Sequence, residues 1–218
     1  MAKMDSDEIT KLEKYYRISL INSVIGYRAL NLLGTTSTDG ITNLCIISSV
    51  FHLGANPPLI GLVIRPEREH NDTLRNIRST GEYTLNNVLP ECYAQAHQTS
   101  ASYPSGVSEF DICHFKKLYI RDFKAPFVKE SNIRIGLELR DMIDMEINGT
   151  TIVIGEIVHI LTEDGLIGED GTVDHGKAET MTVAGLDTYY LPQPVGQLAY
   201  AKPGIEPHLL NTKVNSDI

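Results

Sequence analysis

The feature that most constrains the fold is a pair of short apolar runs, residues 44–47 and 59–64, both rich in β-branched side chains. Such side chains pack well on a pleated sheet, and runs of this length favour strands over buried helices. An Asp-Gly dipeptide at 39–40 precedes the first run, and Asn-Pro-Pro at 56–58 separates the two. Glycine accepts the positive φ of a hairpin turn, and proline interrupts a strand. The segment therefore predicts short strands joined by tight turns.

The pattern changes period after residue 70. Asn71 or Asp72 can cap a helix that has Leu74 and Ile77 on its apolar side and ends near Gly81. We expect a helix within 90–102, a loop at 103–111, and further strands at 83–86, 118–121, 133–140, 151–161 and 179–183. Many short strands with few helices indicate a β-barrel rather than alternating βαβ units. The sequence has no Gly-rich dinucleotide fingerprint and no Walker loop.

Charge and composition argue against several classes of protein. The formal net charge of −9 opposes a nucleic-acid binder, which needs a basic face to displace counterions, and opposes adhesion to an anionic membrane. No apolar run approaches the roughly 20 residues that cross a bilayer. The first eight residues are polar and acidic, unlike a secretory signal. We therefore expect a cytoplasmic protein that binds neither nucleic acid nor membrane.

Cysteine and histidine spacing predicts no metal site. Cys45, Cys92 and Cys113 lie far apart and form no Cys-x-x-Cys pair, so reduced thiols are expected. The histidines show neither the His-x-x-x-His nor the His-Glu-x-x-His spacing of a zinc site.

A small cationic cluster follows the second apolar run. Arg65, Arg68 and His70 come just before Thr73, near the start of the expected helix. In an acidic chain an anionic ligand needs such a cluster. Arginine binds a phosphate through two parallel N–H donors, and the Thr73 hydroxyl and the free N–H groups of the first helical turn add further donors. The competing interpretation is a solvated charged turn, which is what most such runs are.

Polar side chains also stand at both ends of the first apolar run. Asn43 precedes it, Ser48 and Ser49 follow it, and Val50 and Phe51 come next. Donors at the ends of a buried strand are rigid, which suits the edge of a flat, hydrogen-bonding ring. The alternative is that these hydroxyls bond to their own backbone. Together with the cationic cluster, they predict a site for a planar ring that carries a phosphate.

Four segments, in this order, resemble the flavin reductase-like, FMN-binding split-barrel family, especially its flavoredoxin-type branch. They are the stretch 35–81, Gly-Val-Ser-Glu-Phe at 106–110, Ala-Pro-Phe-Val-Lys-Glu-Ser at 125–131 and Ile-Gly-Glu-Ile-Val at 154–158. The resemblance implies a mainly β fold, an FMN-binding split β-barrel of Greek-key type with a few short helices. It also divides the chain into a flexible lead (1–14), the split-barrel domain (15–203) and a C-terminal tail (204–218).

The same resemblance implies an FMN-dependent oxidoreductase that passes electrons from NAD(P)H or a redox partner through FMN. It implies a homodimer with FMN near the subunit interface, and a small molecule or a redox protein as electron partner. The residues expected to bind the cofactor are Asn43, Ser48, Ser49, Val50, Arg65, Arg68, His70 and Thr73.

Several alternatives stay open at this point. FMN can be a tight prosthetic group or an exchanging substrate, and the protein can be a non-catalytic FMN-binding electron carrier. A split barrel can also hold haem or a pyridoxal-type phosphate. The resemblance places five residues in segments near the flavin or the partner chain, but ordinary surface and packing roles fit them equally well: Tyr93, His97, Glu109, Tyr189 and Tyr190. No catalytic acid or base is assigned.

Overall fold

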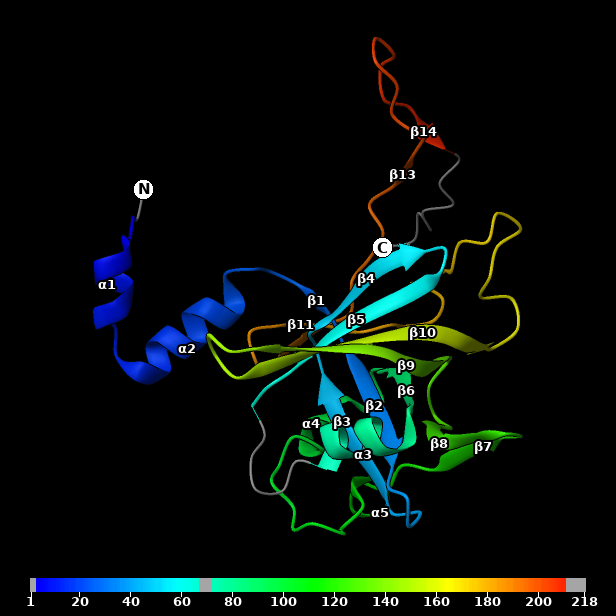
Figure 1. Cartoon of the computed structure of the whole chain (residues 1–218). Coiled ribbons are helices and arrows are strands. Elements are labelled where there is room, and N and C mark those ends of the chain that lie inside the picture. The colour runs from blue at the N-terminus through cyan, green and yellow to red at the C-terminus, as the bar shows by residue number, and fades with distance from the viewer. Residues whose placement is uncertain (1–2, 67–71, 211–218) are drawn as a thin grey trace.

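A seven-stranded antiparallel sheet runs through the centre of the molecule in the order β3-β2-β6-β9-β10-β5-β4 (Figure 1). The structure, a computed structural model, describes residues 3–66 and 72–210. The strands of the large sheet are β2 (Asn31–Thr36), β3 (Thr42–Ile47), β4 (Val50–Ala55), β5 (Pro58–Ile64), β6 (Glu82–Asn87), β9 (Ile133–Met145) and β10 (Thr150–Thr162).

Smaller elements surround this sheet. A three-stranded sheet has the order β1-β11-β12, and β7 pairs with β8 and β13 with β14. These strands are β1 (Arg28–Ala29), β7 (Lys117–Ile120), β8 (Phe123–Val128), β11 (Thr182–Ala184), β12 (Thr188–Tyr190), β13 (Gln197–Leu198) and β14 (Leu209–Leu210). The helices are α1 (Ser6–Lys11), α2 (Lys14–Ser23), α3 (Asp72–Thr80), α4 (Tyr93–Gln98) and α5 (Glu109–Ile112).

The turn and helix signals of the stretch 35–81 act as the sequence predicts. Gly40 takes a φ of +83° between β2 and β3, and the Ser37 hydroxyl accepts hydrogen bonds from the amides of Asp39 and Ile41. Helix α3 begins at Asp72. It ends before Gly81, which has a φ of +75°. The predicted hairpin and the predicted helix are both confirmed.

Three elements differ from the sequence-based expectation. Strand β4, which follows Ser48 and Ser49, was not expected; it leaves β3 and pairs with β5. Helix α5 occupies part of the expected loop 103–111, and four residues are too few to show a helical period. In the expected tail, Leu209–Leu210 form β14, which pairs with β13.

The two faces of β2 are both covered, which fixes the positions of the surrounding helices. Leu32 and Leu33 are adjacent and fully buried, and they point to opposite faces as successive strand residues do. Leu32 belongs to the same core cluster as Phe110 of α5. Leu33 belongs to the cluster of Leu74 and Ile77, the apolar side of α3. Helix α3 therefore covers one face of the β2–β3 end of the sheet, and α4 and α5 cover the other (Figure 1).

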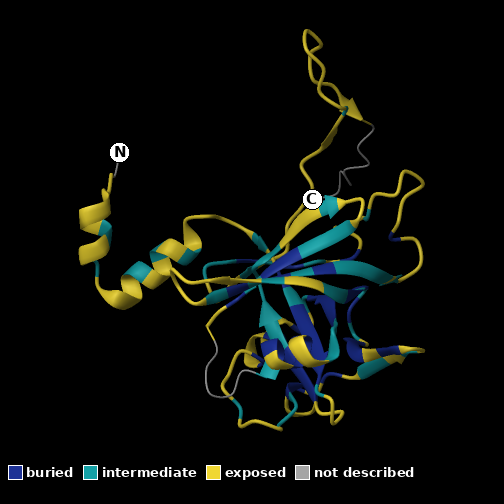
Figure 2. Ribbon diagram, in the orientation of Figure 1, coloured by how far each residue is buried: buried dark blue, intermediate teal, exposed yellow. Residues whose placement is uncertain are grey.

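Two parts of the chain project from this body. Helices α1 and α2 extend to one side, and the β13–β14 hairpin extends from the top in the view of Figure 1. Neither helix buries a residue against the rest of the chain, as the yellow and teal ribbon shows in Figure 2. Within the described part of the chain, no helix is long and apolar enough to cross a membrane.

Candidate functional site

A buried polar network joins β3 to the two segments that flank it, and we call it the Glu109 junction. Its members are Thr35 of β2, Asn43 of β3, Thr73 and Asn76 of α3, and Glu109 of α5. All of them are at most 8% exposed. Buried polar groups must find hydrogen-bond partners, because unpaired ones forfeit their hydration without compensation.

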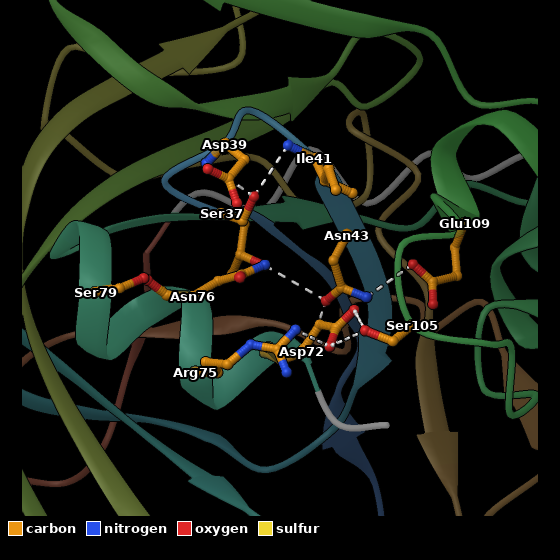
Figure 3. A network of polar contacts seen from close by, with 12 residues as sticks. Ser37, Asp39, Ile41, Asn43, Asp72, Arg75, Asn76, Ser79, Ser105 and Glu109 are labelled. Atoms are coloured by element: carbon orange, nitrogen blue, oxygen red, sulfur yellow. Dashed lines mark hydrogen bonds and ion pairs between the residues drawn. The ribbon is translucent and has the colours of Figure 1, made fainter. Parts of the chain in front are cut away.

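Asn43 is the centre of this junction. Its amide nitrogen donates to Glu109 Oε2 at 2.8 Å, and its amide oxygen accepts from the Thr73 hydroxyl at 2.7 Å. Asn76 of α3 donates to the Thr35 hydroxyl at 3.1 Å, which in turn reaches the Asn43 oxygen at 3.4 Å. Figure 3 shows Asn43 lying between Glu109 on one side and α3 on the other.

The outer edge of β3 is covered by side chains from the segment 93–112. Glu109 Oε2 also accepts from the backbone N–H of Leu44 at 3.0 Å. The N–H of Ile46 donates to the Thr99 hydroxyl at 2.8 Å. Because β3 ends the order of the large sheet, these groups take the place of a neighbouring strand.

Burial is the main cause of the raised pKa values of Glu109 and Cys45. It raises the pKa of Glu109 even though the hydrogen bonds from Leu44 and Asn43 act in the opposite direction. Burial also raises the pKa of Cys45 to about 11, opposed by its contact with the Thr73 hydroxyl and reinforced by the charge of Glu109. A thiol with so high a pKa stays protonated at neutral pH and is a poor nucleophile.

The other predicted ligands form a second group at the ends of β3 and β5. The Ser49 hydroxyl donates to the backbone oxygen of Val63 at 2.6 Å. Val63 lies two positions before Arg65 in the sequence. Arg65 follows the end of β5 and is exposed. Ser48 is half-buried, and its hydroxyl has no hydrogen-bond partner within residues 3–66 and 72–210. Val50 begins β4 and is half-buried.

Arg28 is a cation that sequence reasoning missed. Burial and, secondly, the positive charge of Arg65 lower the pKa of Arg28. One terminal nitrogen of Arg28 donates to the backbone oxygen of Gly185. Its Nε is buried and has no partner among the described residues. A single arginine ahead of a two-residue strand gives no sequence signal, because the fold alone brings it towards Arg65.

These features fit an anionic group. Two arginines near each other gain stability from a phosphate between or beside them, and Arg28 has a donor still to be satisfied. Among the described residues, Arg65 forms no ion pair that would neutralise it. Arg68 and His70, the other members of the predicted cationic cluster, lie outside the described residues. The flavin-binding roles of all eight predicted residues stay predictions.

Three of the residues whose roles stayed open meet on the surface. His97 Nδ1 and the Tyr189 hydroxyl are 2.6 Å apart, and the Tyr93 ring lies 5.5 Å from the Tyr189 ring. Tyr190 contacts Tyr27 edge to face, with ring centres 4.7 Å apart. The fifth residue, Glu109, belongs instead to the buried junction.

The chain matches one protein family over most of its length. A family model described as "Flavin reductase like domain" matches residues 28–181. A solved structure from Shewanella frigidimarina, provisionally designated a flavin reductase with a split barrel domain, is 44% identical. The match covers 92% of this chain and 100% of the Shewanella chain, with a TM-score of 0.89.

More distant solved structures share the fold. Nitrilotriacetate monooxygenase component B from Bacillus cereus is 22% identical and has a TM-score of 0.79, with 91% of this chain and 98% of that chain covered. Flavoredoxin of Desulfovibrio vulgaris is also 22% identical, with a TM-score of 0.67 and coverage of 82% and 91%. The predicted fold, a mainly β split barrel with a few short helices, is confirmed.

Proposed function

Because this chain belongs to the flavin reductase-like domain family, we propose that it is an FMN-dependent oxidoreductase that passes electrons from NAD(P)H or a redox partner through the flavin. The observation that supports this most is the family match, which spans residues 28–181. The matched region includes the turn at 37–40, where Gly40 has a positive φ. It also includes strands β3, β4 and β5 and helix α3, which follow this turn. Bound FMN would supply the hydride-accepting and electron-passing chemistry.

In this proposal the arginines hold the phosphate. Arg65 is the predicted ligand, and Arg28 is a second cation, whose pKa is lowered by burial and by the charge of Arg65. Guanidinium groups donate two parallel hydrogen bonds to a phosphate, which a lysine cannot do. The Gly185 contact of Arg28 fixes one end of its side chain, and its buried Nε has no partner among the described residues. Arg28 therefore loses little conformational freedom when it binds an anion.

The ring would be held by the residues where β3 and β4 meet. The Ser48 hydroxyl has no partner among the residues that the structure describes and can serve a ligand, whereas that of Ser49 already donates to Val63. Val50 offers an apolar surface. Asn43 and Thr73 are engaged within the protein, because Thr73 donates to the Asn43 amide oxygen and Asn43 donates to Glu109. Their contribution to flavin binding is through the position of their neighbours.

The first experiment is the visible absorption spectrum of the purified protein, before and after denaturation and filtration. We expect flavin bands, and FMN in the filtrate. Retention of the flavin on dilution identifies a prosthetic group, and its loss identifies an exchanging substrate. A colourless protein that fails to bind added FMN contradicts the proposal, and absorbance without flavin bands points to haem or a pyridoxal-type phosphate.

A second experiment separates an enzyme from an electron carrier. NADH or NADPH is added to the flavin-loaded protein without oxygen, and the flavin absorbance is followed. Rapid bleaching supports nicotinamide oxidation by this protein. A flavin that stays oxidised with both nucleotides, but is reduced by a redox protein, supports the carrier.

We also propose that the protein is a homodimer. Helix α2 exposes a stripe of large apolar side chains at three-residue spacing, with exposed fractions of 71% for Tyr15, 36% for Ile18 and 48% for Ile21. Ile25, in the turn that follows the helix, is 65% exposed. Spacing of this kind places the side chains on one side of a helix. Such a contiguous apolar surface is uncommon on a monomer, and a second chain is the partner that the family resemblance implies.

A further inference from the structure

We propose that Glu109 is a positioning residue for flavin binding, which acts through Asn43 and Thr73 on the first turn of α3. The inference rests on the proposed function. Glu109 is only 8% exposed, and its Oε2 already accepts from Asn43 and Leu44, so we assign it no direct contact with the flavin. Its role is to fix three separate segments of the chain to one another beside the proposed flavin site.

The first step is the link between α5 and β3. A single carboxylate oxygen, Oε2, accepts from both the Asn43 side chain and the Leu44 backbone, at 2.8 and 3.0 Å. Two donors that converge on one oxygen hold it in a narrow range of positions, and bonds to a charged acceptor are stronger than neutral ones. Next to this pair, the hydroxyls of Thr42 and Ser108 are 2.6 Å apart. The segment that carries Glu109 is thus attached to β3 at two neighbouring points.

The second step runs from β3 to α3. Because Glu109 engages the amide nitrogen of Asn43, the amide group has one orientation, with its oxygen directed towards Thr73. Thr73 is the second residue of α3, and its hydroxyl proton is given to that oxygen at 2.7 Å. If Glu109 were absent, the amide would keep only the Thr73 and Thr35 hydroxyls as partners, which can accept as well as donate, so its orientation would be less fixed. The first turn of α3 would then lose its fixed partner.

An independent contact ties the same segment to the same turn. The Ser105 hydroxyl donates to the Asp72 carboxylate at 3.3 and 3.4 Å, and Asp72 also pairs with Arg75. Asp72 is thus held from outside by Ser105, and Thr73 from inside by Asn43. The start of α3 is fixed on both sides by residues that depend on the placement of the segment 103–109.

The position of the first turn of α3 should affect binding of the FMN phosphate more than binding of the flavin ring. The first turn of a helix presents free N–H groups, whose usefulness to an anion depends on direction and distance. The apolar and hydroxyl contacts proposed for the ring, at Ser48 and Val50, lie on other elements. Loss of Glu109 is therefore expected to weaken FMN, which carries a phosphate, more than riboflavin, which carries none.

The experiment measures the dissociation constants of FMN and riboflavin for the full chain and four variants. In Glu109→Ala the junction is lost, and we expect FMN affinity to fall about tenfold more than riboflavin affinity. Glu109→Asp keeps the charge but shortens the reach, and should act in the same direction if Glu109→Ala does not fold. In Glu109→Gln the amide oxygen can accept the same two N–H groups, so both affinities should stay within about threefold of the parent.

The matched control is Asn87→Ala. Asn87 is another buried bridging residue, whose oxygen accepts from the amides of Asn132 and Ile133 and whose nitrogen donates to Thr180. Its loss should lower stability and leave the ratio of FMN to riboflavin affinity unchanged. An unchanged ratio in Glu109→Ala and Glu109→Asp overturns the positioning role. If the unmodified protein binds neither flavin, the proposed function itself has failed.

Discussion

At the scale of single residues, the structure separates polar side chains that are engaged inside the protein from those that are not. Asn43 and Thr73 look alike in sequence to Ser48, since all are polar groups beside an apolar run. Only the fold shows that Thr73 is engaged with Asn43, and Asn43 with Glu109. Glu109 lies 65 or more positions from its partners on β3, and no local pattern could reveal that pairing. In a segment of serines and glycines, a lone glutamate predicts exposure.

The arginine pair gives the first prediction. Arg65→Ala and Arg28→Met should each weaken FMN binding by about 1.5–3 kcal/mol, because each removes a charged donor to the phosphate. Methionine keeps the apolar stem of Arg28 and its packing. The measurement is the FMN dissociation constant from flavin fluorescence. Arg140→Ala is the control for lost charge, since Arg140 is exposed and pairs with Glu138 and Glu156. Unchanged FMN affinity in Arg65→Ala would remove the phosphate assignment.

Glu109 also predicts a pH effect on stability. Its pKa is raised in the folded protein above the ordinary value of 4.5, so the folded state binds this proton more tightly than the unfolded state. Stability from this group is therefore complete below pH 4.5 and declines as the pH rises through the raised pKa. Glu109→Gln removes the decline, so the variant should gain in unfolding free energy relative to the parent between pH 4.5 and pH 8.

Chemical denaturation of both proteins at several pH values tests this. The charged and titratable neighbours, Asp72 on α3, Cys45 on β3 and Cys113 after α5, are present in both proteins. Subtracting the two unfolding curves largely removes their own titration. A difference between parent and variant that stays constant with pH would show that Glu109 does not change its protonation in this range.

At the scale of elements, the sequence predicted what local pattern controls and missed what pairing controls. The strands at 44–47 and 59–64 and helix α3 follow from apolar runs, turn residues and caps that lie within a few positions of one another. Strand β4 does not, because its burial is mostly partial or absent and it exists through its pairing with β5. The same holds for β1, whose two residues form a strand only beside β11.

Strand β2 supplies the prediction at this scale. A Cβ at Gly34 would lie 2.5 Å from the backbone oxygen of Pro126 and 2.5 Å from the Thr84 hydroxyl. Backbone cannot move aside as a flexible side chain can, so Gly34→Ala should lower the unfolding free energy by about 1–3 kcal/mol. The measurement is urea unfolding. Gly176→Ala is the control, because its Cβ would meet side chains only, at 3.3 and 3.8 Å. Equal stability of both variants would contradict close packing of β2 on β8.

At the scale of the whole molecule, the central sheet is covered by other parts of the chain, whereas the projecting elements expose apolar side chains. Both faces of β2 are covered from within the chain, whereas α2 and the β13–β14 hairpin expose large apolar side chains, including Tyr15 at 71% and Tyr200 at 91%. A single chain has no internal partner for these surfaces among the residues described. The split barrel could be predicted from motif order, but the direction of the projections could not, since it depends on contacts that no local pattern encodes.

The homodimer gives the last prediction. Size-exclusion chromatography with light scattering should report twice the chain mass of 24.2 kDa. Ile21→Asp places a charge in the apolar stripe of α2 and should shift the population towards monomer, because an unpaired charge in an interface is costly. Ser19→Asp adds the same charge to an exposed polar position of the same helix and should remain dimeric. A monomeric parent protein would contradict the proposal.

The covered edge of β3 has a consequence for how the protein behaves in storage. Without Thr99 and Glu109, the amides of Leu44 and Ile46 would form an open row of donors beside an apolar strand. An open strand edge is a template for a strand from another molecule, and it leads to aggregation. Any treatment that detaches the segment 93–112, such as mild heating or a truncated loop, should therefore produce turbid solutions before the rest of the sheet unfolds. The glutamate that organises the interior of one molecule also keeps molecules from adhering to one another.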